Sequence, residues 1–475
     1  MKTLSLRISP ASRAINREVL SLALPSILAN VAVPLIGIVD IAVAGHQPSE
    51  IIPAATFIGG ISIGSMIFDM LYWCFDFLRL GTSGMTAQAY GRRDWRGIAT
   101  ILTRGVGVAL GFAAVCLLLQ WVILQVAFLC IPCSPEVKSL ASQYFYIRIL
   151  AVPATLSLMA FRGWFIGLQD TVSAMAVDLT VTFLNVLCAI FLSLGLHAGP
   201  VQLSGIGFRG IAVAVVIAQY SGLLLAGSIL AAKYWKRTFA LCRGRELLRE
   251  AFRGSEIRRY FSLNADLFVR SLSFIGVYIG FTLIATSYGD LALAVASILM
   301  KILMLFSYFT DGFAFAGEAL VGRFVGAKDP GGLRLTVRWI FLWSAAVCLL
   351  FTLIYIFGGE WILGILTSDA EVIGACSPYM LWLYIMPAFG CIAFAWDGVY
   401  IGATAVKPIR NVMVLSTLSF LGSYFVLAVI FRPDPSLAVH FLLGAYFIHL
   451  VVRAVGLTAA YKGSILSPVE KEEGR

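Results

Sequence analysis

Long hydrophobic runs, separated by short polar segments, cover most of the chain. Each run holds roughly 20 or more mainly apolar residues, which is the length that a helix needs to cross a bilayer. Alternating segments of about ten residues, which are typical of membrane β-barrels, are absent from the pattern. The pattern therefore predicts an all-α polytopic membrane protein with about twelve transmembrane helices. The predicted spans lie near residues 19–45, 51–88, 96–129, 135–168, 171–195, 204–233, 258–286, 289–325, 331–358, 371–402, 409–431 and 436–461.

Composition and charge distribution support this class. Hydrophobic residues make up 60% of the chain and charged residues 13%, whereas soluble domains have about 45–50% and about 25%. The net charge is +10, and the basic residues gather in alternate loops, for example at Arg92, Arg93 and Arg96. Basic residues are enriched in cytoplasmic loops of membrane proteins. We therefore expect both termini in the cytoplasm and no nucleic-acid partner.

Two sequence motifs recur at a spacing of 235 residues. The segment Gly91–Asp94 (GRRD) returns at Gly326–Asp329 (GAKD), and Gly163–Gly167 (GWFIG) returns at Gly398–Gly402 (GVYIG). Each half holds six predicted spans, an even number, so both halves insert in the same direction. The chain is therefore predicted to be a parallel duplication of two six-helix lobes, related by a pseudo-two-fold axis along the membrane normal.

A basic linker joins the predicted lobes. Its residues Leu247, Leu248, Ala251 and Phe252 fit one face of a short amphipathic helix on the inner membrane surface, where the linker's charges would touch anionic lipids. The predicted organisation is a cytoplasmic N-terminal segment at 1–18, an N-terminal lobe at 19–233, the linker at 234–257, a C-terminal lobe at 258–461 and a cytoplasmic tail at 462–475.

The first predicted span contains Asn30, Pro34 and Asp40. Pro34 cannot donate a backbone hydrogen bond, so it frees a carbonyl group and can bend the helix before Asp40. No basic residue lies within one helical turn of Asp40 in the sequence, and an ionisable residue inside a membrane is a functional candidate by default. An unpaired carboxylate there can exchange protons near neutral pH, so we predict Asp40 as the proton-coupling residue. The alternative is that Asp40 is merely solvated near the outer surface.

Other polar residues of the first half share helix faces. Asp76 precedes Arg79 by three residues, so the two can form an internal ion pair. Asp178 and Asn185 are seven residues apart, which places them on one face of the fifth predicted helix. The predicted cavity lining of the N-terminal lobe is Asn30, Pro34, Asp178 and Asn185.

The second half carries three acids within predicted spans. Asp311 and Glu318 repeat the seven-residue spacing, and Asp397 lies in a later span. These acids predict an acidic zone in the C-terminal lobe that attracts the substrate or holds Na⁺. Alternatively, the internal acids form a structural web of salt bridges. The arginines available for such a web are Arg148, Arg162 and Arg270.

No motif of an enzyme or a cofactor site is present in the sequence. The glycine-rich stretches lack the lysine of a phosphate-binding loop, and there is no nucleophile elbow. No cluster of His, Cys and Asp has the spacing of metal ligands. We therefore expect no catalysis, no cofactor and no bound metal, apart from a coupling ion that is H⁺ or Na⁺.

Several long motifs resemble those of one transporter family. They are LPSILANVAVPLIGIVDIAVAGH, FDFLRLGTSGMTAQAYGRRD, YIRILAVPA, FRGWFIGLQDT, LNVL and DGFAFAGEALVGRFVGAKD. From about residue 16 to 460, the chain is similar to the multidrug and toxic compound extrusion (MATE) family. The segment FLRLGTSGMTAQAYG is most similar to the DinF-like branch of that family.

This resemblance implies two six-helix lobes that export organic cations or lipophilic compounds in exchange for H⁺ or Na⁺. It also implies a monomer in contact with lipids in the bacterial inner membrane. The family's carboxylate in the first helix corresponds to Asp40, and its asparagine in the fifth helix corresponds to Asn185. The DinF-like pattern often has an aspartate four residues after that asparagine, where this chain has Ala189. Asp178 is the candidate substitute for the missing acid.

Two other functions are compatible with a polytopic chain. A flippase of the same fold would move a lipid-linked or phosphate-bearing substrate and would need basic residues to hold phosphate. A membrane-embedded lipid transferase would need paired acids in short D-x-x-x-D motifs, and no intramembrane pair of that kind is present. The basic residues that keep the flippase alternative open are Arg79, Arg148, Arg162, Arg270 and Lys301.

Overall fold

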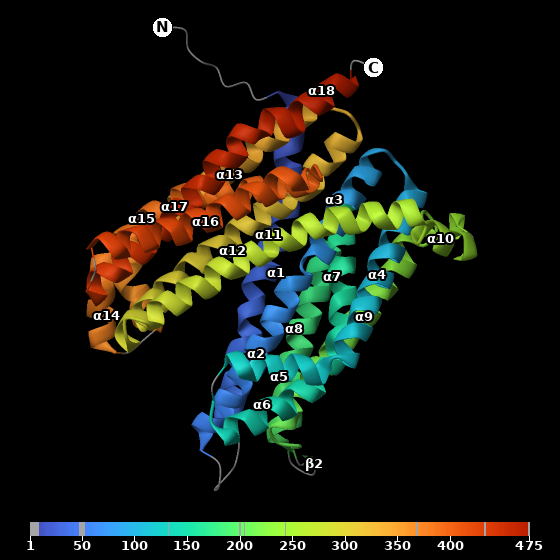
Figure 1. The fold of residues 1–475 in the computed structure, drawn as a ribbon. Coiled ribbons are helices and arrows are strands. Elements are labelled where there is room, and N and C mark those ends of the chain that lie inside the picture. Colours follow the sequence, from blue (N-terminus) through green and yellow to red (C-terminus); the bar gives the residue numbers. More distant parts are fainter. Residues whose placement is uncertain are drawn as a thin grey trace.

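The computed structural model consists of two bundles of helices, which we call the N-lobe and the C-lobe (Figure 1). Twelve helical segments within the described part of the chain are long and apolar enough to cross a membrane. The predicted all-α polytopic fold is therefore confirmed. The ends of the predicted N-terminal segment and tail, at 1–8 and 474–475, lie outside the described residues. The structure describes residues 9–46, 53–131, 133–198, 201–203, 205–242, 244–366, 369–431 and 434–473.

The N-lobe contains the first six spans and a short hairpin. Strands β1 (Leu196–Ala198) and β2 (Val201–Leu203) pair antiparallel, with Leu196 opposite Leu203. The helices of this lobe are α1 (Pro10–Gly45), α2 (Ala54–Phe75), α3 (Phe77–Gly91), α4 (Trp95–Leu118), α5 (Gln120–Cys130), α6 (Pro135–Arg148), the 3₁₀ turn η1 (Ile149–Ala151), α7 (Val152–Gly167), α8 (Thr171–Leu194), α9 (Arg209–Ile229) and the π-helical turn η2 (Leu230–Tyr234).

The linker and the C-lobe complete the chain. The linker comprises η3 (Phe239–Leu241) and α10 (Gly244–Ala251). The C-lobe comprises α11 (Gly254–Thr286), α12 (Asp290–Gly326), α13 (Pro330–Leu366), α14 (Ala370–Cys376), η4 (Ser377–Tyr379), α15 (Met380–Gly402), α16 (Val406–Phe431), α17 (Pro435–Tyr461), η5 (Lys462–Leu466) and α18 (Ser467–Glu473).

Four predicted spans are interrupted rather than continuous. The second changes from α2 to α3 at Asp76. The third ends at Leu118, and the 11 residues of α5 that follow extend only about 16 Å, which is too short to cross a bilayer. The fourth span is broken by η1, which ends two residues before Pro153. The tenth span is broken by η4, which contains Pro378. A proline lacks the backbone donor that a continuous helix needs.

The backbone shows the duplication directly. Within the described ranges, four residues other than glycine have a positive φ angle, namely Arg93, Gln169, Lys328 and Thr404. They form two pairs at the 235-residue spacing, Arg93 with Lys328 and Gln169 with Thr404. Positive φ is uncommon outside glycine, so its recurrence at equivalent positions confirms that the two lobes are copies of one unit.

The lobes meet at the end of the molecule that carries both termini and diverge toward the end that carries the β1–β2 hairpin (Figure 1). We call these the basic end and the hairpin end. Helices α3 and α12 cross at the basic end. A Cβ atom on Gly322 would lie 2.4 Å from the Cβ of Ala87, its equivalent in the other lobe. Only a small residue permits this approach.

Hydrogen bonds beside this crossing follow the same symmetry. Gln88 of α3 donates to the hydroxyl of Thr404 at 3.0 Å, and Arg323 of α12 donates to the side-chain oxygen of Gln169 at 3.1 Å. Both donors and both acceptors are 235 residues apart. The tip of each crossing helix is thus held by a turn of the opposite lobe.

The linker helix α10 packs against the N-lobe. Leu247 and Ala251 are buried, as expected for one face of an amphipathic helix, whereas Leu248 and Phe252 are about half exposed. The Phe252 ring lies against Gly107 of α4, and Arg104 of α4 donates to the carbonyl oxygen of Ala251 at 2.7 Å. The linker is therefore attached to α4 by specific contacts.

The orientation in the membrane can be tested by cysteine labelling. In a background without the nine native cysteines, Arg93→Cys, Arg237→Cys and Lys407→Cys should react only with reagent on the cytoplasmic side, because basic loops stay inside. Ala198→Cys and Asp434→Cys should react only from outside. Labelling of residues 198 and 237 from the same side would contradict the twelve-span topology.

The crossing of α3 and α12 can be tested by adding volume at its centre. Gly322→Val should force the two helices apart at the basic end, because overpacking typically costs about 1–3 kcal/mol. Spin labels at Val172→Cys and Lys407→Cys, equivalent exposed sites at the first turns of α8 and α16, should then report a longer distance. Gly422→Val is the control, because a Cβ on Gly422 meets open space. Identical distance distributions for the two variants would contradict the crossing.

Candidate functional site

A buried ion pair joins the two lobes. The Nη1 of Arg79, in the first turn of α3, lies 3.3 Å from Oε1 of Glu318 on α12. The Nε of Arg79 lies 3.1 Å from Oδ1 of Asp76. The Glu318 side chain is only 2% exposed. Asp76 and Arg79, which are predicted as a pair within one lobe, thus belong to a triad whose third member comes from the other lobe.

A second arginine connects α1 to this region. The Nε of Arg162, on α7, lies 3.2 Å from Oδ2 of Asp178 on α8. Its Nη2 donates to Oδ1 of Asn30 at 2.9 Å. The Asn30 side chain also lies 3.5 Å from the carbonyl oxygen of Tyr308, to which its amide nitrogen donates. Because Tyr308 belongs to α12, Asn30 contacts both lobes.

One aromatic ring lies beside both arginines. The guanidinium carbons of Arg79 and Arg162 lie 4.8 and 5.6 Å from the ring centroid of Phe315, within the range of cation–π attraction. These residues form one group at the boundary between the lobes, which we call the central cluster. It consists of Asn30, Asp76, Arg79, Arg162, Asp178, Phe315 and Glu318.

Asp40 lies outside the central cluster, ten residues beyond Asn30 on α1, which corresponds to about 15 Å of helix. It is 3% exposed, and its Oδ1 has no hydrogen-bond partner in the described part of the chain. The charge that acts on it most directly is Arg148 of α6. Arg148 donates to the hydroxyls of Ser65 and Tyr144 at 3.1 and 2.7 Å. Asp40 is thus enclosed by the N-lobe rather than solvated at the surface.

The other predicted cavity residues of the N-lobe, Pro34 and Asn185, lie on α1 and α8. Pro34 lies inside α1, which stays helical from Pro10 to Gly45, and its missing donor leaves the carbonyl of Asn30 without its usual helical partner. Asn185 is 2% exposed, and no described residue bonds to its Oδ1. Ala189, one turn later, is fully buried.

In the C-lobe, Asp397 of α15 binds two arginines. Its Oδ2 accepts hydrogen bonds from Arg270 of α11 at 2.5 Å and from Arg453 of α17 at 2.8 Å. Arg453 is 1% exposed. With two arginines for one carboxylate, this group carries net positive charge. Arg270 is expected from the sequence and Arg453 is not, although an arginine within the apolar run HLVVRAVGL meets the same criterion for an intramembrane charge.

The three predicted acids of the C-lobe therefore have different surroundings. Glu318 pairs with Arg79 of the N-lobe, and Asp397 with two arginines of its own lobe. Asp311 accepts a hydrogen bond from Ser307 at 3.4 Å. Lys301 is exposed. No group of three His, Cys, Asp or Glu side chains that could hold a metal ion occurs within the described ranges.

The comparisons with known proteins assign the fold to a family. A family model described as MatE matches residues 25–191 and 267–428, most of each lobe. The chain belongs to the MatE family. It is also 33% identical over 443 residues to the DNA damage-inducible protein F of Escherichia coli (strain K12), covering 93% of this chain and 91% of that protein. The predicted relationship to the MATE family and its DinF-like branch is confirmed, so the protein is a multi-pass MATE efflux transporter and not an enzyme.

Solved structures share this fold. A multidrug resistance MATE family transporter of the MOP superfamily in an outward-facing conformation aligns with a TM-score of 0.79 at 16% identity, covering 98% of this chain and 100% of that one. A MOP superfamily transporter from Pyrococcus furiosus Vc1 (DSM3638) aligns with a TM-score of 0.79 at 15% identity, covering 98% and 99%. At these identities the likeness concerns the fold alone.

The pair between Arg79 and Glu318 can be tested by a double-mutant cycle. Arg79→Gln leaves the buried Glu318 unpaired and should destabilise the purified protein by about 3 kcal/mol or more. Glu318→Gln should cost less, because Asp76 still neutralises Arg79. The double variant should recover part of the loss, as measured by thermal unfolding in detergent. Glu472→Gln, at the exposed pair with Lys328, should change stability by less than about 1 kcal/mol. Strictly additive effects of the two buried substitutions would contradict the pairing.

Proposed function

We propose that this transporter is a secondary antiporter that exports organic cations or lipophilic compounds in exchange for protons, with Asp40 as the proton carrier. The observation that carries the proposal is the buried Asp40 carboxylate, whose Oδ1 lacks a hydrogen-bond donor among the described residues. A carboxylate in such a site gains a proton more readily than one that is paired or solvated. The chain would act as a monomer in the bacterial inner membrane.

The arrangement of the lobes supports an outward step for the proton. If both termini are cytoplasmic, the hairpin end faces outside, and the lobes diverge toward that end (Figure 1). Asp40 lies near the end of α1 that leads to the hairpin end. In the proposed cycle an outside proton neutralises Asp40 and the substrate leaves outward. The lobes then rock, and the proton leaves toward the cytoplasm.

Helix α1 is placed to couple these events. Neutralising Asp40 removes its attraction to Arg148, and Pro34 allows α1 to adjust its bend between Asp40 and Asn30. Asn30 contacts Arg162 of the N-lobe and the backbone of Tyr308 in the C-lobe. A ligand or proton moves such an equilibrium only by binding the two states differently. In this proposal a change in the bend of α1 alters the contacts of Asn30 at the boundary between the lobes, so that protonation of Asp40 favours one arrangement of the lobes over the other.

The residues of the N-lobe cavity and the C-lobe acids take secondary roles in this proposal. Asp178, held by Arg162, stands in for the acid that is missing at Ala189. Asn185 lines the same cavity. Asp311 is the C-lobe acid most suited to attract a cationic substrate or Na⁺, because Glu318 and Asp397 are already paired with arginines.

A second candidate function rests on the arginines of the C-lobe. The Nε and Nη1 of the buried Arg453 have no hydrogen-bond partner in the described segments. Arg270 and Arg453 together outnumber Asp397, and paired guanidinium groups suit phosphate. This observation favours a flippase that moves a lipid-linked or phosphate-bearing substrate, which remains the alternative to export of cations.

Proteoliposomes with separately imposed gradients test the proposal. A proton gradient alone should drive efflux of a fluorescent organic cation, and a sodium gradient alone should not. Asp40→Asn should reduce proton-driven efflux to background while the protein stays folded, because an amide cannot titrate. Asp290→Asn, which makes the same change at an exposed site at the start of α12, is the control. Parental efflux by Asp40→Asn would exclude Asp40 as the coupling residue, and efflux driven only by sodium would exclude proton coupling.

A further inference from the structure

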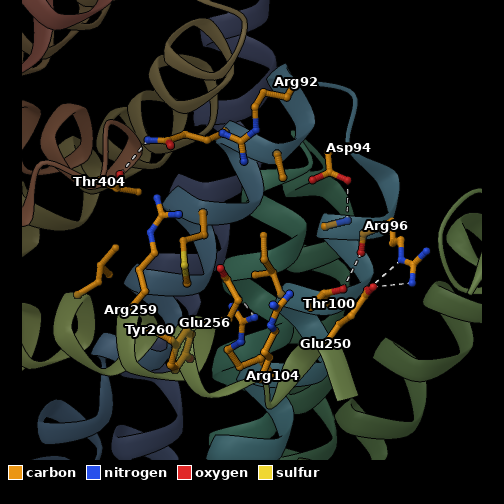
Figure 2. A pocket seen from close by; sticks show the side chains of 17 residues that line it. Arg92, Asp94, Arg96, Thr100, Arg104, Glu250, Glu256, Arg259, Tyr260 and Thr404 are labelled. Carbon is orange, nitrogen blue, oxygen red and sulfur yellow. Dashed lines mark hydrogen bonds and ion pairs between the residues drawn. The ribbon is translucent and has the colours of Figure 1, made fainter. Parts of the chain in front are cut away.

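A cavity of about 500 Å³ opens at the basic end, away from the central cluster and from Asp40. Residues of both lobes and of the linker line it (Figure 2). Arg92 comes from the end of α3, Arg104 from α4 and Arg259 from α11. Thr404, in the turn between α15 and α16, also lines the cavity from the C-lobe. The charged residues of the lining are Arg92, Asp94, Arg96, Arg104, Glu250, Arg253, Glu256 and Arg259.

The three carboxylates of this cavity already have partners. Glu250 accepts two hydrogen bonds from Arg96, at 2.9 and 2.5 Å. Asp94 caps the first turn of α4 by accepting from the backbone N–H of Gly97 at 2.8 Å. Glu256 lies 3.7 Å from Arg104. The carboxylates therefore neutralise only part of the positive charge.

Three arginines of the lining remain without an ion pair to any described residue, namely Arg92, Arg253 and Arg259. They belong to the N-lobe, the linker and the C-lobe respectively. Arg104 lies deeper, 4% exposed, with its guanidinium carbon 6.0 Å from the centroid of the Tyr260 ring. Arginines converging from three elements, with fewer acids than bases, create a positive potential inside a concave site.

We propose that this cavity binds a phosphate group and that the bound phosphate holds the two lobes together at the basic end. Guanidinium groups donate parallel hydrogen bonds that match the oxygens of phosphate. The group could come from an anionic phospholipid headgroup, because the basic end is the predicted cytoplasmic side, where anionic lipids gather. It could equally be a soluble phosphate. The shared chemistry is the anionic oxygen atoms of a phosphate group.

The position of the cavity predicts a conformational effect. Arg92 moves with the N-lobe and Arg259 with the C-lobe, so a phosphate that contacts both is held only while the lobes are together at this end. Such a ligand favours the state with the basic end closed, in proportion to its difference in affinity between the two states. The conformational effect of the phosphate rests on the proposed movement of the lobes, whereas the binding of phosphate to the cavity does not.

The binding test uses full-length protein in nanodiscs and two probes. One probe is inorganic phosphate, titrated at constant ionic strength into protein in phosphatidylcholine discs. The other is phosphatidylglycerol, introduced into the discs at the expense of phosphatidylcholine. Binding of either probe, read as a rise in Tm, supports the site. A response to phosphate alone identifies a soluble source, and a response to the lipid identifies a headgroup.

Matched double variants locate the binding. Arg92→Gln/Arg259→Gln should weaken binding roughly tenfold or more, because two of the guanidinium groups that attract the phosphate are lost. Arg237→Gln/Arg338→Gln removes the same charge from exposed arginines outside the cavity lining and should bind like the parent. If the cavity double variant fails to fold, Arg259→Gln alone, at an exposed side chain, makes the same comparison. No response in either arm, or equal loss in the two double variants, would overturn the site.

Spin labels at Val172→Cys and Lys407→Cys then test the clamp. In the parental background, the ligand that binds should shift the distribution of distances between the two labels to shorter values and narrow it. In Arg92→Gln/Arg259→Gln the same ligand should leave this distribution unchanged. Binding without any change in this distance would overturn the clamp but not the site. Because these measurements need no transport, their failure is distinct from a failure of proton-driven efflux.

Discussion

The close approach of α3 and α12 at the basic end is the constraint on which the rest of the arrangement depends. Ala87 and Gly322 occupy equivalent positions in the two repeats and face each other across the pseudo-two-fold axis. Any larger pair would separate the helices there. The approach brings Glu318, one turn from Gly322, within reach of Arg79, and it places Gln88 and Arg323 against the turns of the opposite lobe.

The duplicated backbone is symmetric, but its chemistry is not. A Cβ on Gly167 would meet the carbonyl of Ser83, and a Cβ on Gly402 would meet that of Glu318, so Ser83 and Glu318 are equivalent positions. By the same spacing, Arg162 of the N-lobe corresponds to Asp397 of the C-lobe. Charges of opposite sign thus stand at matching places. The helical scaffold is repeated, whereas the buried charged groups are particular to each lobe.

Much of the fold follows from the sequence because it depends on local properties. Apolar length determines the spans, and the recurrence of Gly91 and Gly326 with their neighbours reveals the duplication. The seven-residue spacing of Asp311 and Glu318 correctly places them on one helix face, but it does not say which helix that face meets. The contact of Glu318 with Arg79, 239 residues away, depends on the packing of two lobes. No local pattern contains that information.

The placement of charges also explains why Asp40 stands apart. In a medium of low polarity an ion pair is retained because separating it exposes two uncompensated charges, and Asp76, Asp178, Glu318 and Asp397 are all held in this way. Carboxylates fixed by arginines contribute to architecture, because moving either partner away would leave a buried charge uncompensated. Among the described residues, Asp40 lies in the field of Arg148, whose Nη1 donates to the hydroxyls of Ser65 and Tyr144. In the proposed cycle Asp40 changes its charge, while the carboxylates that are paired with arginines hold the helices together.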